Sequence, residues 1–273
     1  MEDENKPKNL TAGHLQQLKA ATQDIRREVA ASGANLEHLP KEVRKKLLGD
    51  RVWWAWLYEL SIIQHSALFY YSLGLIEPIK AALAASEDKL QAFLDFERNY
   101  EPDDKTADDF LDSEANVERR ALCSCTLIAL LRQIECLERD GCYMSDLVAK
   151  VAKGGAEGDE AFFKALRVDR TVVSCPTFGE RISRAALEDD QPFFANLAKG
   201  IKTKWKKASP KKQESHKDLR ILLQASHEAG QLQALSMTEA DQLFIQELGV
   251  YSDEGEDPAR SLQRFILRFR NNK

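Results

Sequence analysis

The segment from Val52 to Ile76 constrains the fold more than any other, because it reads VWWAWLYELSIIQHSALFYYSLGLI. A helix of this length could cross a bilayer, and aromatic residues stand near both of its ends, as they do at membrane interfaces. Glu59, Gln64 and His65 argue against a membrane span, since one charge at membrane depth costs about 3 kcal/mol or more. We expect instead a helix that runs toward Gly74 and is buried on most sides in a soluble protein.

Apolar residues spaced by three and four predict helices along most of the remaining chain, starting with an amphipathic helix over about residues 11–31. Strand character is limited to residues 168–175. This stretch could equally be an extended connection, because Pro176 keeps Cys175 out of the helical conformation. The sequence therefore predicts an all-α fold. It consists of an N-terminal helical bundle around a buried Trp-rich helix, followed by a smaller C-terminal helical region.

A glycine pair, Gly154-Gly155, indicates a joint between these two regions. We expect the N-terminal bundle to span residues 1–153 and the C-terminal region to span residues 159–273. The charge also changes here: residues 1–158 hold 20 Lys and Arg against 27 Asp and Glu (net −7), and the remainder hold 19 against 17 (net +2). This difference indicates that the two regions have different partners.

A short internal repeat follows the joint, with an offset of 31 residues. Five residues recur: Glu157, Asp159, Phe162, Phe163 and Leu166 return as Glu188, Asp190, Phe193, Phe194 and Leu197. The period is typical of a helical hairpin, but a repeat array needs at least three copies. A local duplication or a coincidence of amphipathic pattern is the favoured interpretation.

Compartment and chemistry are indicated mainly by what the sequence lacks. The polar start MEDENKPK predicts no signal peptide, and five cysteines without a disulfide pattern fit reduced thiols in the cytoplasm. Cys123, Cys125, Cys136 and Cys142 do not have zinc-ligand spacing, so we expect structural cysteines, no metal and no cofactor.

No catalytic motif is present, so we predict no catalytic residues and expect a protein that is not an enzyme. The glycine cluster at 154–160 lacks the Lys-Ser or Lys-Thr of a phosphate-binding loop. His65 lies on a polar stripe of the apolar segment, which either lines a pocket or forms an internal hydrogen-bond network. An enzyme built around Glu59 and His65 is the third-ranked alternative.

Two basic elements indicate a partner of negative charge. Residues 199–217 hold eight lysines, one acid and Trp205, a pattern that suits either phosphate contact with base stacking or a solvated helix end. Within it we name three candidate phosphate contacts: Lys204, Lys206 and Lys207.

The second basic element is the terminal helix, for which Asp257-Pro258 is a cap and first-turn pair. Its apolar face carries Leu262, Phe265, Ile266 and Phe269. Its basic side carries Arg260, Arg264 and Arg268, joined by Arg270. A helix over 239–248 precedes it, as in a DNA-binding helix-turn-helix. The connection at 249–256 is longer than the usual turn, and its acids would either repel DNA or pair with the arginines.

We therefore expect a non-enzymatic helical regulatory protein that contacts nucleic acid through this helix-turn-helix-like basic helix. Arginine suits both phosphate contact and guanine recognition. The alternative is a helical interaction or scaffold protein that holds a protein partner or self-associates through its helix faces. No membrane partner is expected.

Overall fold

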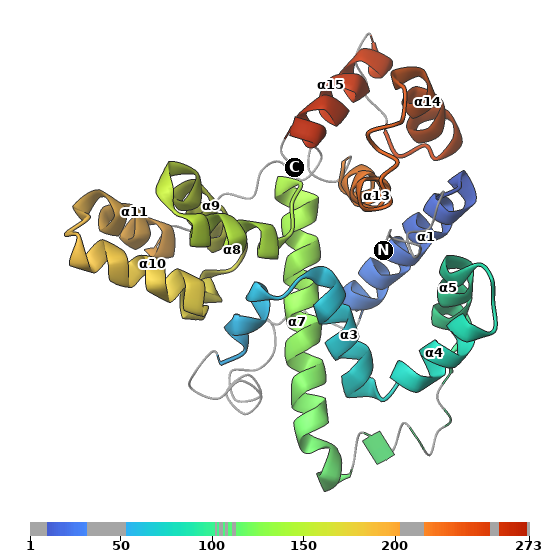
Figure 1. Ribbon diagram of the computed structural model, residues 1–273, viewed down its shortest axis with the longest axis horizontal. Coiled ribbons are helices and arrows are strands. Elements are labelled where there is room, and N and C mark those ends of the chain that lie inside the picture. Colours follow the sequence, from blue (N-terminus) through green and yellow to red (C-terminus); the bar gives the residue numbers. More distant parts are fainter. Residues whose placement is uncertain are drawn as a thin grey trace, which may run out of the picture. The chain divides into compact units, whose positions relative to one another are not determined.

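The computed structural model (Figure 1) consists of helices joined by turns. It describes residues 10–31, 53–101, 103, 106, 109–110, 113–202, 216–251 and 257–271. No strand occurs among these residues, and the all-α prediction is confirmed. Residues 168–175, which had some strand character, include the 3₁₀ helix η3 (Arg170–Ser174).

Contacts divide the chain into two compact units, and each is described by itself. Unit 1 comprises Met1–Leu39, Ser86–Asp95 and Lys207–Lys273, and unit 2 comprises Pro40–Ala85 and Phe96–Lys206. This division does not fall at the expected joint between residues 153 and 159. The reason is that α8 (Met144–Lys153) and α9 (Gly155–Val168) pack closely on one another across Gly154.

Unit 1 is a small helical module. Its elements are α1 (Ala12–Ala31), the first part of α5 (Lys89–Asn99), α13 (Lys217–Glu228), α14 (Met237–Asp241), the π-helical turn η4 (Gln242–Glu247) and α15 (Pro258–Asn271). Their core joins Leu15 of α1 to Leu222 of α13, Phe244 of η4 and Ile266 of α15, all at most 1% exposed. Burial of these apolar faces holds the helices together.

The ends of α14 and α15 follow from short sequence signals. Asp257 accepts a hydrogen bond from the Arg260 backbone N–H at 3.0 Å, so the predicted cap of the last helix is confirmed. The preceding helix, expected over 239–248, is capped by Ser236, which forms a capping box with Glu239. That helix therefore begins at Met237.

Unit 2 is organised around α7 (Val117–Asp140), the long green helix in Figure 1, against which α3, η1, α8 and α9 all pack. Its other elements are η1 (Trp53–Glu59), α3 (Ile62–Leu73), α4 (Ile76–Ala84), η2 (Glu114–Asn116), α10 (Pro176–Leu187) and α11 (Gln191–Lys202). The Trp-rich segment contributes η1 and α3 to this unit, and both pack against α7.

The Trp-rich segment is not one continuous helix, and this part of the sequence prediction was wrong. A 3₁₀ helix, η1, ends at Glu59, and α3 begins after Ser61. The break is stabilised by a capping box, in which the Ser61 hydroxyl accepts from the Gln64 N–H and the Gln64 side chain accepts from the Ser61 N–H. No helix in the described ranges is both long and apolar enough to span a bilayer.

The internal repeat corresponds to two consecutive helical hairpins, α8–α9 and α10–α11, whose equivalent residues meet. Arg181 binds the equivalent acids: its Nε and Nη2 donate to Asp159 at 2.7 and 2.9 Å, and Nη2 also donates to Asp190 at 3.0 Å. The equivalent rings of Phe162 and Phe193 lie edge to face, 5.1 Å apart. Arg181 thus joins the two copies.

Candidate functional site

The basic face of α15 is the strongest candidate for a binding site. Arg260, Arg264 and Arg268 are all exposed, and they follow one another at four-residue spacing along one side of the helix. Each step advances about 6 Å along the helix axis. Among the residues that the structure describes, no acidic side chain forms an ion pair with any of the three. The face therefore presents a row of positive charges to solvent.

The opposite face of α15 anchors the helix in unit 1. Leu262 and Ile266 are fully buried, and Phe269 is 5% exposed. The buried apolar residues and the three exposed arginines thus lie on opposite sides of the helix, as the spacing predicted, whereas Leu267 is 48% exposed. The rigid placement of the arginines follows from this burial, because the helix cannot rotate without exposing its apolar face.

Arg270 differs from the other three arginines. Its Nη2 donates hydrogen bonds to the backbone carbonyls of Leu232 and Leu235, the second at 2.9 Å. These residues lie in the turn that follows α13, so Arg270 ties that turn to α15. Its guanidinium is engaged in these intramolecular hydrogen bonds, so Arg270 is not one of the proposed nucleic-acid contacts.

Other predicted elements of the basic site lie outside the described residues. Lys204, Lys206 and Lys207 belong to this group, as do the acids of the loop at 252–256. The last turn of α11 is described, and Lys199 and Lys202 are exposed there.

The connection between η4 and α15 differs from the short turn of a helix-turn-helix. After Gly249, which has a φ of 56°, Val250 and Tyr251 both donate from their backbone N–H to the carbonyl of Phe244, at 3.0 and 3.3 Å. Both side chains are buried, at 7% and 6% exposure. The chain therefore enters the core before it reaches α15. Beyond this connection, α14 packs against α15.

Unit 2 contains a buried polar network that sequence reasoning missed. The Tyr58 hydroxyl donates to Asp169 Oδ2 at 2.7 Å, and Thr171 donates to Asp169 Oδ1 from both its N–H and its hydroxyl at 2.8 Å. Arg132 Nε lies 3.4 Å from Asp169 Oδ2. Burial, and then the charge of Asp169, raise the pKa of Tyr58 well above its usual value. The carboxylate is saturated with donors, so the network joins η1, α7 and η3 and offers no free group to a ligand.

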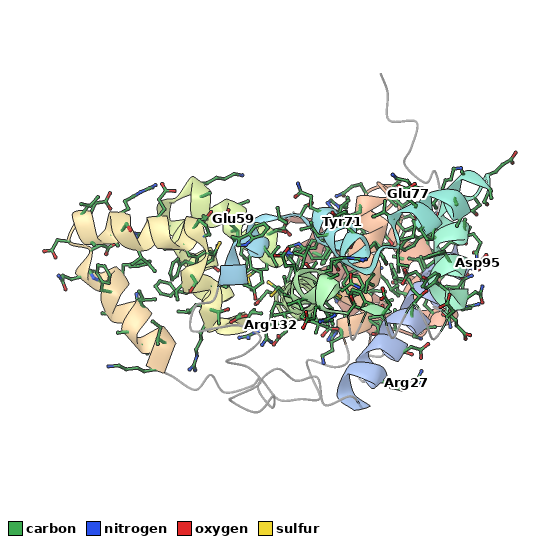
Figure 2. The ribbon with its side chains drawn as sticks, turned by 90° about the horizontal axis from the view of Figure 1, so that it is seen from below. Arg27, Glu59, Tyr71, Glu77, Asp95 and Arg132 are labelled. Atoms are coloured by element: carbon green, nitrogen blue, oxygen red, sulfur yellow. The ribbon has the colours of Figure 1, made fainter. Side chains whose placement is uncertain are left out.

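Glu59 and His65 do not form an acid–base pair. The carboxylate of Glu59, a residue labelled in Figure 2, accepts from the Thr177 N–H and hydroxyl at 2.9 and 2.7 Å, so it stabilises the start of α10. His65 is fully buried, with Nδ1 3.0 Å from the Ser61 carbonyl and no described hydrogen-bond partner for Nε2. Burial lowers the pKa of His65. Each side chain has a local structural partner, and the third-ranked alternative gains no support.

Within the described ranges, no group of three or more His, Cys, Asp or Glu side chains is placed to hold a metal ion. All five cysteines are free thiols. Burial raises the pKa of Cys125 to about 11 and that of Cys175 to about 12, so these two thiols are unreactive near neutral pH.

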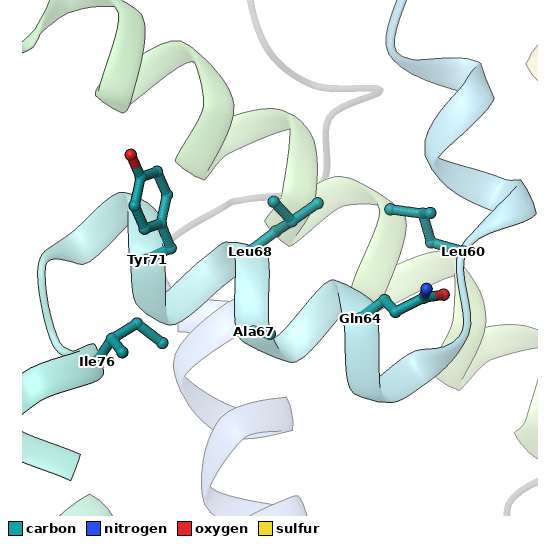
Figure 3. Close-up of a pocket in the computed structure, with 6 residues that line it drawn as sticks. All are labelled: Leu60, Gln64, Ala67, Leu68, Tyr71 and Ile76. Carbon is teal, nitrogen blue, oxygen red and sulfur yellow. The ribbon is translucent and has the colours of Figure 1, made fainter. Parts of the chain in front are cut away.

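An apolar depression lies along α3 (Figure 3). It is lined by Leu60, Gln64, Ala67, Leu68, Tyr71 and Ile76. Two apolar side chains of α3 are strongly exposed, Ile63 at 77% and Tyr71 at 64%. This segment contains no charged residue between Leu60 and Ile76. Contiguous exposed apolar surface of this kind is typical of interaction sites.

The fold and this site define a helical protein with an exposed basic helix face and a separate apolar depression. No family model, no curated protein and no solved structure matches the chain.

Proposed function

We propose that the chain is a non-enzymatic helical protein that contacts nucleic acid through Arg260, Arg264 and Arg268 of α15. The observation that supports this proposal is the row of three exposed arginines that have no described acidic partner, on a helix held by its opposite face. A free guanidinium binds phosphate through charge-assisted hydrogen bonds and can also recognise guanine.

The test is fluorescence anisotropy of labelled duplex DNA and single-stranded RNA over a salt series. Each phosphate contact contributes about 0.9 to the slope of log affinity against log salt on duplex DNA, so removing three contacts lowers the slope by at most about 3. The variant is R260A/R264A/R268A. A matched control, R98A/R170A/R184A, removes the same charge from three exposed arginines on other elements.

Loss of binding only in the α15 variant is the expected result, whereas equal loss in both variants would indicate an unspecific charge effect. A third variant, R260K/R264K/R268K, keeps the charges but loses bidentate geometry. We expect it to retain the salt slope. If the α15 alanine variant binds as the unsubstituted protein does, the proposal is wrong.

A second candidate function is protein interaction or self-association through the apolar depression on α3, supported by the exposure of Ile63 and Tyr71. Light scattering over a concentration series tests self-association. The variant I63E/Y71E should then be monomeric at all concentrations. The control L187E changes an apolar residue of α10 that is even more exposed, at 89%, and should leave the mass unchanged.

A further inference from the structure

The chain reverses at Gly141, at the carboxyl end of α7, and this reversal brings two cysteines together. Gly141 has the left-handed conformation, with φ 76°, and its N–H donates to the Leu137 carbonyl at 2.9 Å. In this type of helix end, the residue after the glycine folds back on a residue in the last turn. Here these two residues are Cys142 and Cys136.

The two thiols contact one another directly. The side chains of Cys136 and Cys142 are hydrogen-bonded, and both are free thiols. Cys136 is fully buried, whereas Cys142 is 9% exposed and lies at the edge of the core. Of the two residues, Cys142 is therefore the more accessible to a reagent from solvent.

The charged side chains that act on Cys136 differ from the one described beside Cys142. The Lys164 ammonium interacts with Cys142, and Cys142 lies two residues before the first residue of α8, where the helix dipole favours negative charge. The carboxylates of Asp140 and Asp146 act on Cys136. The hydrogen bond to Cys142, burial and these carboxylates together raise the pKa of Cys136. Negative charge is thus disfavoured on Cys136, and the charge described beside Cys142 is the Lys164 ammonium.

We propose that Cys136 and Cys142 are a redox modification site, at which hydrogen peroxide converts the dithiol to an intramolecular disulfide. The Cys142 thiolate attacks one peroxide oxygen, the O–O bond breaks, and Cys142 sulfenic acid and hydroxide form. The Cys136 sulfur then attacks the sulfenic sulfur; its proton goes to the leaving hydroxide, and the S–S bond forms. In total, two thiols and one peroxide give one disulfide and two waters.

The other cysteines cannot replace either member of this pair. Cys125 and Cys136 both lie on α7, about 16 Å apart along the axis at 1.5 Å per residue. Cys123 and Cys125 are two residues apart on the same helix and point to different sides. Cys175 contacts Glu59, with 3.6 Å between sulfur and oxygen. Among the described cysteines, a hydrogen bond between two thiols joins Cys136 and Cys142, so the linkage is expected between these two.

The test begins with the folded, reduced full chain, treated with increasing hydrogen peroxide and then alkylated in denaturant. Before alkylation, the treated protein is expected to be lighter than the reduced protein by two hydrogen atoms. After alkylation, the number of alkylated thiols is expected to fall from five to three. Peptide mapping of the unsubstituted protein should identify the linkage, and a dithiol reductant should restore all the thiols. A full set of alkylatable thiols, a linkage between other cysteines, or oxidation only beyond sulfenic acid would each overturn the proposal.

Two variants test the order of the steps. In C136S the sulfenic acid of Cys142 has no thiol to attack it, so it should accumulate and be trapped by dimedone. In C142S, Cys136 should give no dimedone adduct at the same peroxide dose. The reverse result would refute the assigned order. The control C175S should form the disulfide as the unsubstituted protein does. This proposal does not rest on nucleic-acid binding, because neither cysteine is among the proposed contacts.

Discussion

Replacing Tyr58 by Phe removes from the buried network the hydroxyl that donates to Asp169 and also interacts with the Thr171 side chain. The ring is fully buried and keeps its packing, so the main change is loss of the 2.7 Å bond to Asp169. A hydrogen bond to a charged acceptor contributes about 1.5–3 kcal/mol. Asp169 keeps both bonds from Thr171, so no charge is left without donors. We therefore expect unfolding to require about 2 kcal/mol less in the variant.

Denaturant unfolding followed by tryptophan fluorescence is the suitable assay, because Trp53, Trp54 and Trp56 lie in η1 beside Tyr58. The midpoint should fall while the denaturant dependence stays unchanged. Tyr71→Phe is the matched control, since that tyrosine is 64% exposed, and its effect should lie within about 0.5 kcal/mol of zero. An equally small effect of Tyr58→Phe would refute the assigned role of the network.

The same pair of proteins should differ in alkaline stability. Burial and the charge of Asp169 raise the pKa of Tyr58 in the folded state, whereas a tyrosine in the unfolded chain ionises near about pH 10. The stability from this shift is fully present below about pH 10 and is lost as pH rises above it. The advantage of the unsubstituted protein over Tyr58→Phe should therefore shrink above that pH. A constant difference would contradict the shift.

Two further substitutions test other parts of unit 2. Arg181→Ala removes the bonds to Asp159 and the stacking on Phe193, whose ring centroid is 4.1 Å from the guanidinium carbon, and should cost about 2 kcal/mol in denaturant unfolding. The exposed Arg184 gives the control, Arg184→Ala, with an effect near zero. Burial lowers the pKa of His65, so stability should fall as pH drops below about 6.5 toward the folded-state pKa. In His65→Phe this contribution to the pH dependence should be missing, and an unchanged profile in acid denaturation would contradict the role of His65.

Local signals in the sequence predicted the elements whose ends and faces depend on neighbouring residues. Asp257-Pro258 and the apolar spacing of α15 fall in this class, and the structure bears them out. The break at Ser61 belongs to it as well, because Ser61 and Gln64 have the spacing of a capping box. That signal was overlooked, since the apolar run around it favoured one long helix.

Contacts between distant residues could not be predicted in the same way. Tyr58 and Asp169 lie 111 residues apart, and nothing near either residue indicates the other. The internal repeat related Asp159 to Asp190, but Arg181, which binds both, lies between the two copies. The contact between Cys136 and Cys142 lies between these two cases. It was not predicted from the sequence, but the helix end at Gly141, a local feature, determines it.

The two sides of α15 allow binding and folding to be tested separately. The core contacts of the helix come from Leu262, Ile266 and Phe269, so exposed arginines can be substituted without opening the core. Arg270 is the exception, since its hydrogen bonds hold the turn after α13. A binding defect from the three exposed arginines therefore reports lost charge on the surface. A defect from Arg270 would combine lost charge with a loosened helix, and it could not be assigned to either cause alone.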